Sequence, residues 1–294
     1  MKNKTVYLLM ILATFFWAGA FIAGKLGINA LSPTLLTFFR MGLASLILFP
    51  VLIHKHPQTW KINSDQLKIV IATGLIGMIG YHMFFFSALK YTTASKAAMI
   101  NASNPLITAF LASLFVSEKL TLKKIFFIFT ALLSVIFILI NGNIENLLTL
   151  TLNKGDLLML CGTLSWAIYS VIVRKYIRQF GALKLSAYTF LSSTIMLAPF
   201  ALITFVKTNA IAVGLNPYLA VIYMAIFPTV IGYLIQQYAI GQIGASKTAL
   251  FINLVPIIST LLAVILLNET VHFYHLVSLI GIILSVIGFN RVKV

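Results

Sequence analysis

The chain has 294 residues, of which 61% are hydrophobic and only 9% are charged. Soluble domains carry about 25% charged residues, so this composition excludes an ordinary water-facing surface and indicates a protein embedded in lipid. The formal net charge of +16 does not indicate nucleic-acid binding, because Lys and Arg lie in short gaps between apolar runs and form no continuous stripe.

The apolar runs are long enough for helices that cross a bilayer, about 20 residues each, and they lack the alternation of a membrane β-barrel. We therefore expect an all-α integral membrane fold with about ten transmembrane helices. In chain order the predicted spans are 5–24, 33–53, 67–89, 95–117, 123–140, 155–174, 184–206, 218–240, 246–267 and 273–290. The first run could also be a cleaved signal peptide, but the bulky side chains before Ala18 favour a span.

Positive charges are unequally divided between the two sides that ten spans define. With the N-terminus inside, the inside segments hold Lys2, Lys4, Lys55, Lys61, Lys68, Lys119, Lys123, Lys124, Arg174, Lys175, Arg178, Lys184, Lys247, Arg291 and Lys293. The outside segments hold Lys25, Lys90, Lys96, Lys154 and Lys207. Because cytoplasmic loops carry the excess of Lys and Arg, we expect a cell-membrane protein with both termini in the cytoplasm.

The two halves of the chain repeat the same short motifs in the same order. The pairs are Gly80-Tyr81 with Gly232-Tyr233, Ala94-Ser95-Lys96 with Ala245-Ser246-Lys247, Pro105 with Pro256, Glu118 with Glu269, and Trp17-Ala18 with Trp166-Ala167. This predicts a duplication with one repeat at 5–141 and the other at 153–290. Each half has an odd number of predicted spans, so the halves should lie in the membrane with opposite orientations, as in many secondary transporters.

With these motifs the chain resembles the EamA family of the drug/metabolite transporter superfamily. The resemblance rests on Trp17-Ala18, Arg40 and the two stretches 94–118 and 245–269, in which a proline precedes a glutamate at the span end. It implies ten transmembrane helices in two inverted five-helix repeats, alternating access, and a central cavity lined mainly by spans 1, 3, 4, 6, 8 and 9. Members of the family move small metabolites, amino acids and some drugs, often outward.

Two ionisable residues, Arg40 and His82, lie clearly inside predicted spans. Such residues usually face a cavity or a partner, since they are costly in lipid. Arg40 could attract a carboxylate, but the structural alternative, bonding to helix-end carbonyls or reaching outward, is favoured because span 2 is peripheral by resemblance. His82 could carry a proton, or it could be a neutral, hydrogen-bonded side chain.

Uncharged polar residues supply further candidates for a solute-binding site: Asn101, Asn104, Asn253, Gln236 and Gln237. Asn101 and Asn104 are three residues apart and so lie near one helix face just before Pro105, and Asn253 and Pro256 are also three residues apart. Each proline frees a backbone carbonyl one turn earlier, so these sites could bind a polar ligand or allow gating, or the amides could simply join helices.

Aromatic residues at helical spacing could form a wall for a flat solute: Trp17, Phe21, Tyr81, Phe85, Trp166, Tyr169 and Tyr233. The alternative is ordinary packing or lipid contact, which is common for aromatic side chains in membrane helices.

All five acidic residues, Asp65, Glu118, Glu145, Asp156 and Glu269, fall in loops or near span ends. With no acid in mid-membrane, a cationic drug would have no partner, so a neutral or zwitterionic metabolite such as an amino acid fits better. Glu118 and Glu269 should stabilise the turn into the next helix. The single cysteine, Cys161, excludes an intramolecular disulfide and a thiolate zinc site, and we expect neither metal nor cofactor.

The function that these features predict is export of small metabolites by alternating access, with a small-molecule substrate and the lipid bilayer as partners. A monomer and a homodimer are both compatible with the sequence. The alternatives are an intramembrane enzyme, for which the chain lacks H-E-x-x-H and G-x-S-x-G motifs, and a non-transporting channel or scaffold.

Overall fold

The computed structural model describes residues 2–115, 121–148, 152–210, 214–243, 251 and 254–292. All regular secondary structure in these residues is helical. Within the described part of the chain, eight helices are long and apolar enough to cross a membrane, and two shorter apolar helices cover Leu254–Leu267 and Phe273–Phe289. The prediction of an all-helical, multi-pass membrane protein is therefore confirmed.

The first half contains α1 (Lys2–Gly27), α2 (Pro33–Lys55), α3 (Ser64–Thr73), η1 (Gly74–Gly80), α4 (Tyr81–Tyr91), α5 (Ala94–Asn101), α6 (Asn104–Phe115), α7 (Leu122–Leu139) and α8 (Glu145–Leu148). Local sequence sets several of these starts. Ser32 caps α2 by accepting the Leu35 N–H, and Pro33 occupies the first helical turn.

The second half contains α9 (Lys154–Phe180), α10 (Ala182–Lys207), α11 (Asn216–Met224), η3 (Ala225–Ile231), α12 (Gly232–Ile243), α14 (Leu254–Leu267) and α15 (Phe273–Arg291). Asn153 caps α9 by accepting N–H groups of the first turn. Gly181 separates α9 from α10 with a φ of 71°, a backbone conformation that favours glycine.

Two predicted spans contain a π-helical stretch, η1 and η3, in corresponding places. Within η1 the chain closes a five-residue hydrogen bond from the Tyr81 N–H to the Ile76 carbonyl. Within η3 the Gly232 N–H bonds to the Phe227 carbonyl in the same way. Both stretches end beside a repeated Gly-Tyr pair, so the wider turn recurs with the motif. Such π-helical turns occur frequently at functional sites.

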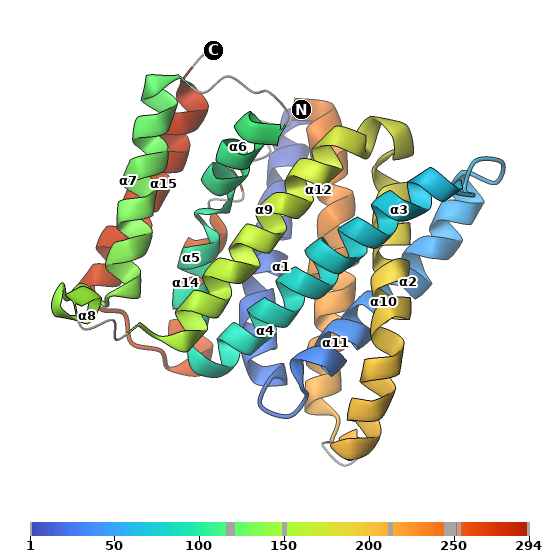
Figure 1. Cartoon of the computed structure of the whole chain (residues 1–294), viewed down its shortest axis with the longest axis horizontal. Helices are drawn as coiled ribbons and strands as arrows, with labels where there is room; N and C mark the ends of the chain where they lie inside the picture. The colour runs from blue at the N-terminus through green and yellow to red at the C-terminus, as the bar shows by residue number, and fades with distance from the viewer. Residues whose placement is uncertain are drawn as a thin grey trace.

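Helices of one half pack mainly on helices of the other half. The pair α7 and α15 lies on one side, α2 packs along α10 on the opposite side, and α1, α4, α9, α12 and α14 fill the middle (Figure 1). The first long helix of each half contacts the π-containing span of the other half, α1 with η3 and α9 with η1. Both chain termini lie at the same end of the bundle (Figure 1).

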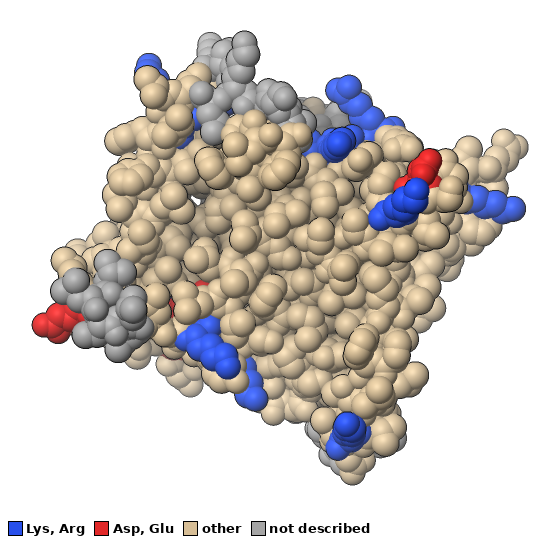
Figure 2. All heavy atoms as spheres, in the orientation of Figure 1, with Lys and Arg blue, Asp and Glu red and all other residues tan. Residues whose placement is uncertain are grey.

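The surface matches a protein that sits in a bilayer. Figure 2 shows, on one face, charged side chains near the two ends of the molecule and a broad uncharged band between them. Large apolar side chains such as Leu46, Phe126 and Leu202 are exposed on the surface of the protein. Lipid is the solvent that accepts such a surface.

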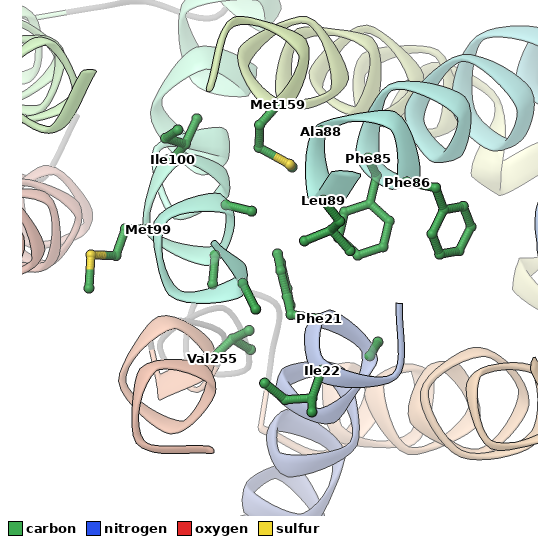
Figure 3. Packing of buried hydrophobic residues seen from close by; sticks show 14 of the residues in the cluster. Phe21, Ile22, Phe85, Phe86, Ala88, Leu89, Met99, Ile100, Met159 and Val255 are labelled. Carbon is green, nitrogen blue, oxygen red and sulfur yellow. The ribbon is translucent and has the colours of Figure 1, made fainter. Parts of the chain in front are cut away.

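One part of the packed interior lies where α1, α4, α5 and α14 meet. Figure 3 shows the side chains of Phe21, Phe85 and Val255 converging there. Phe21 and Phe85 meet edge to face with ring centroids 5.1 Å apart. Because lipid tails are as apolar as these side chains, close packing holds the helices together more than burial from water does.

Candidate functional site

A cavity of about 200 Å³ lies inside the helical bundle, and both halves of the chain line it. Most of the predicted site residues are brought together around it: Trp17, Phe21, Arg40, Tyr81, His82, Phe85, Asn101, Asn104, Pro105, Trp166, Tyr233, Gln236 and Pro256. The cavity is also lined by Met41, Met78, Phe190 and Thr229, which the sequence patterns did not single out. Met41 and Phe190 come from α2 and α10, beyond the helices that the family resemblance implies.

Aromatic rings form much of the cavity wall. Tyr81 stacks on Phe85 with ring centroids 5.7 Å apart and contacts Trp166 at 4.9 Å. The indole N–H of Trp17 donates to the Pro228 carbonyl at 2.9 Å, which ties α1 to η3. These contacts hold the rings in place and leave a mostly apolar surface toward the cavity.

Tyr169 lies outside the cavity, contrary to the expectation that it extends the aromatic wall. It is buried in a notch that Gly77 leaves open, where a Cβ atom on residue 77 would come within 2.3 Å of the tyrosine ring. Its ring packs on Trp166 with centroids 5.0 Å apart. Tyr169 therefore supports the wall from behind.

Arg40 reaches the cavity from α2, although the sequence favoured a peripheral, structural position. Its side chain is 8% exposed, and its Nε–H donates to the Thr229 hydroxyl at 2.9 Å. The hydroxyl of Thr229, which lies in η3, in turn donates at 2.7 Å to the carbonyl of Met224, the last residue of α11. The wider π-helical turn places Thr229 next to the Arg40 guanidinium, which comes from the other half of the chain. The hydropathy of the sequence does not predict such a turn.

His82 lines the cavity but is 2% exposed. Its Nδ1 lies 2.9 Å from the Met78 carbonyl oxygen. Because a carbonyl can only accept, Nδ1 carries a hydrogen, and Nε2 is the acceptor of the neutral ring. The sequence analysis left open that His82 is a neutral, hydrogen-bonded side chain, and in the structure its partner is the Met78 carbonyl.

The two asparagines near Pro105 have different surroundings. Asn104 donates to the Thr163 carbonyl at 2.9 Å and accepts from Thr108, so it joins α6 to α9. The side-chain oxygen of Asn101 is buried and has no hydrogen-bond partner among the described residues. The helix is interrupted between them, because α5 ends at Asn101 and α6 begins at Asn104.

The predictions for three residues cannot be compared with the structure. Asn253 and Glu118 lie outside the described residues, as does the side chain of Gln237, whose backbone belongs to α12. Gln236 does line the cavity.

Glu269 makes a contact that the sequence analysis did not predict, with a helix of the other half. Asn268 follows α14 with a φ of 53°, a left-handed conformation that asparagine tolerates. This turn directs the Glu269 carboxylate to the first turn of α5, where it accepts the N–H groups of Ala94 at 2.7 Å and Ser95 at 3.0 Å, and the Ser95 hydroxyl. An acid of the second half therefore caps a helix of the first half.

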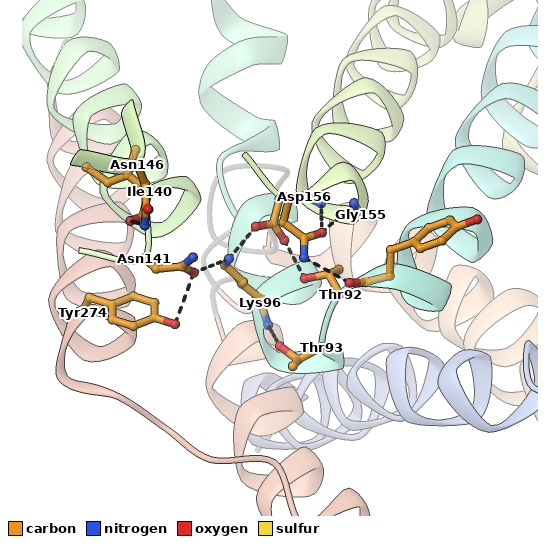
Figure 4. A network of polar contacts seen from close by, with 11 residues as sticks. Thr92, Thr93, Lys96, Ile140, Asn141, Asn146, Gly155, Asp156 and Tyr274 are labelled. Atoms are coloured by element: carbon orange, nitrogen blue, oxygen red, sulfur yellow. Dashed lines mark hydrogen bonds and ion pairs between the residues drawn. The ribbon is translucent and has the colours of Figure 1, made fainter. Parts of the chain in front are cut away.

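A buried ion pair lies beside this cap and joins α5 to α9. Lys96 pairs with Asp156, and both side chains are almost inaccessible (Figure 4). Lys96 also donates to the Asn141 amide oxygen at 2.7 Å, and Asp156 accepts the Thr92 hydroxyl at 2.5 Å. The sequence analysis missed this pair, although the predicted topology placed both residues on the same side of the membrane.

We call Thr92, Ser95, Lys96, Asn141, Asp156 and Glu269 the polar network. It lies at the end of the bundle opposite the two chain termini (Figure 1). Ala98 lines the cavity, and Ser95 is about one helical turn closer to the start of α5. The polar network therefore lies just beyond one end of the cavity.

The described residues contain no group of three or more His, Cys, Asp or Glu side chains that could hold a metal ion. Cys161 is exposed on α9 and has no disulfide partner.

Comparison with known proteins adds independent information. Residues 4–140 and 153–291 match the family model described as EamA-like transporter family. A relative from Bacillus subtilis (strain 168), named uncharacterized transporter YyaM, is 31% identical over 291 residues, which cover 98% of this chain and 94% of that protein. An uncharacterized transporter from Archaeoglobus fulgidus is 30% identical over 286 residues, covering 97% and 96% of the two chains. One solved crystal structure has a TM-score of 0.65 at 19% identity over 99% of both chains, which supports the fold.

Proposed function

Because this chain belongs to the EamA-like transporter family and is a multi-pass membrane transporter, we propose that it exports small metabolites across the cell membrane by alternating access. The proposed solutes are amino acids and related neutral or zwitterionic compounds. They would bind in the cavity of about 200 Å³ between the two halves. The chain acts as a transporter and not as an enzyme in this proposal.

The observation that carries the proposal is the position of the cavity relative to the polar network. Residues of both halves line the cavity, and the cap of Glu269 on α5 and the Lys96–Asp156 pair tie the halves together just beyond it. Closing one end of a central site while the other end can load solute is what alternating access requires.

The pairing of the helices supports an inverted repeat. The contact of α1 with η3 has an equivalent contact of α9 with η1, in which the roles of the two halves are reversed. The pairs α2 with α10 and α7 with α15 each join equivalent helices of the two halves. The interruption beside Pro105 gives the first half a hinge position, and Pro256 is its sequence counterpart. Rocking of one half against the other would use such positions.

The distribution of positive charge supports cytoplasmic termini. Both termini lie at one end of the bundle (Figure 1), and the segments at that end carry most of the Lys and Arg residues. The polar network would then close the outer end, and the cavity would load from the cytoplasm. The walls come from one chain, so a monomer is sufficient for the site, and a homodimer would leave it unchanged.

Counterflow into proteoliposomes tests the proposal. Purified protein is reconstituted into vesicles loaded with an excess of unlabelled solute, and uptake of the labelled solute is measured for a panel of amino acids and uncharged metabolites. We expect transient accumulation of at least one panel member with wild-type protein and with the lipid-facing control Cys161→Ala. Absence of accumulation for every member would contradict the proposal.

A further inference from the structure

We infer that the cavity selects small carboxylic acids in their anionic form, with the carboxylate held by Arg40. A positively charged amino group on the solute is not required. This inference rests on the proposed function, because it names the chemistry of the same site. It concerns which charged group the solute must carry.

The first argument is the missing counter-charge of Arg40. A guanidinium stays protonated in proteins, and this one is 8% exposed within a membrane-spanning helix. Among the described residues, the ionisable side chains that interact electrostatically with it are Tyr81, Tyr223, Tyr233 and His82, and none of them carries a carboxylate. An unpaired positive charge in this position is costly, and an anion that enters the cavity would offset that cost.

The second argument is the supply of hydrogen-bond donors. The guanidinium has five N–H groups, and the bond to Thr229 uses the one on Nε. The four N–H groups on the two terminal nitrogens have no hydrogen-bond partner in the part of the chain that the structure describes. Two parallel N–H groups match the two oxygens of a carboxylate. The bond at Nε fixes the orientation of the planar guanidinium.

The third argument is the size and polarity of the space. A dry cavity of about 150 Å³ accommodates a benzene molecule. The cavity here has about 200 Å³ and aromatic walls that include Trp17, Tyr81 and Trp166. The body of the solute should therefore be one ring or a short aliphatic chain.

The fourth argument concerns the amino group. No acidic residue lines the cavity in the described part of the chain. The buried oxygen of Asn101 can accept one N–H, so an amino group is tolerated. With no negative charge to meet it, an ammonium group adds little to binding.

A set of four probes with the same ring separates the charged groups: 3-phenylpropionate, L-phenylalanine, L-phenylalaninamide and phenethylamine. The first two carry a carboxylate and the last two do not. Binding is measured by quenching of Trp17 and Trp166 fluorescence in a Trp60→Phe background, and by the shift of the melting temperature. We expect 3-phenylpropionate to bind at least as tightly as L-phenylalanine, and the two probes without carboxylate to bind about 30-fold more weakly or worse.

Arg40→Gln should remove the preference for the two probes that carry a carboxylate. Arg40→Lys should retain part of this preference, because lysine keeps the positive charge but lacks the parallel N–H groups of a guanidinium. The matched control is Arg178→Gln, since Arg178 is exposed at the end of α9. If Arg40→Gln does not fold, the wild-type probe series and Arg40→Lys decide the question.

Three results would overturn the inference: phenethylamine binding as tightly as 3-phenylpropionate, an unchanged preference in Arg40→Gln, or no binding of any of the four probes. The proposed function fails differently, through absence of counterflow for every solute, including those that bind. Counterflow of a solute without a carboxylate, together with no binding of the carboxylates, would overturn the inference and leave the proposed function intact.

Discussion

The carboxylate of Glu269 accepts the backbone N–H of Ser95 at 3.0 Å, although the two residues are 174 positions apart in the chain. The bond joins the segment after α14 to the first turn of α5, and it replaces a backbone partner that a helix start lacks. Contacts of this kind explain how short polar segments hold two halves of a membrane protein together at one end.

Removal of this cap should destabilise the protein. We expect Glu269→Ala to cost about 0.5–2 kcal/mol, the range for a lost helix cap, and to lower the melting temperature in detergent. Glu269→Gln keeps an acceptor oxygen and should lose less. Equal melting temperatures for wild type and Glu269→Ala would show that the cap is not used in solution.

The buried pair of Lys96 and Asp156 should be coupled. Removing one partner leaves a buried charge, so Lys96→Met and Asp156→Asn should each cost about 3–5 kcal/mol. The double variant should cost much less than the sum of the two. The measurement is a double-mutant cycle on the free energy of unfolding.

The matched control for this cycle is the pair Lys68 and Asp65, whose side chains are 79% exposed. The same cycle there should give a coupling of about 0–1 kcal/mol. Additive effects at Lys96 and Asp156 would contradict the buried ion pair.

Gly77 should not tolerate a side chain. A Cβ atom there would lie 2.3 Å from the Tyr169 ring, so Gly77→Ala should cost about 1–3 kcal/mol through overpacking. Gly42→Ala is the control, because its Cβ would make an ordinary contact at 3.5 Å with Thr194. Melting temperatures compare the two. A Gly77→Ala protein as stable as Gly42→Ala would show that the notch is not occupied by Tyr169.

Asn101 and Asn104 should respond differently to truncation. Asn104→Ala removes a bond between α6 and α9 and should lower stability by about 0.6 kcal/mol, the average for interhelical hydrogen bonds in a membrane. Asn101→Ala removes an unpartnered buried oxygen and should leave stability unchanged or raise it, while altering solute binding. Thermal unfolding and a binding assay on both variants measure this difference, and the reverse pattern would contradict the assignment.

Much of the fold was predictable because its signals are local. The predicted span 33–53 corresponds to α2 (Pro33–Lys55), since Ser32 and Pro33 mark its start and an apolar run marks its length. Helical spacing suggested that Trp17, Tyr81 and Trp166 could form part of a wall, and all three line the cavity in the structure.

The features that sequence reasoning missed depend on tertiary contacts. The bond of Arg40 to Thr229 requires a π-helical turn in another span, and apolar composition is the same for a π-helix and an α-helix. Tyr169 has the spacing of a wall residue, but the notch at Gly77 takes its ring away from the cavity. Glu269 acts across the two halves, and its span-end position suggested only a local role.

Transport through the cavity can be tested by filling it. Ala98 is 1% exposed and lines the cavity, so Ala98→Trp places an indole in the solute path. The control is Leu114→Trp, since Leu114 is 62% exposed on α6 and faces lipid. Both variants are compared with wild type by counterflow of the same labelled solute, after thermal unfolding has shown that both are folded. We predict that wild type and Leu114→Trp accumulate the solute and that Ala98→Trp does not; accumulation by Ala98→Trp at the wild-type rate would contradict transport through this cavity.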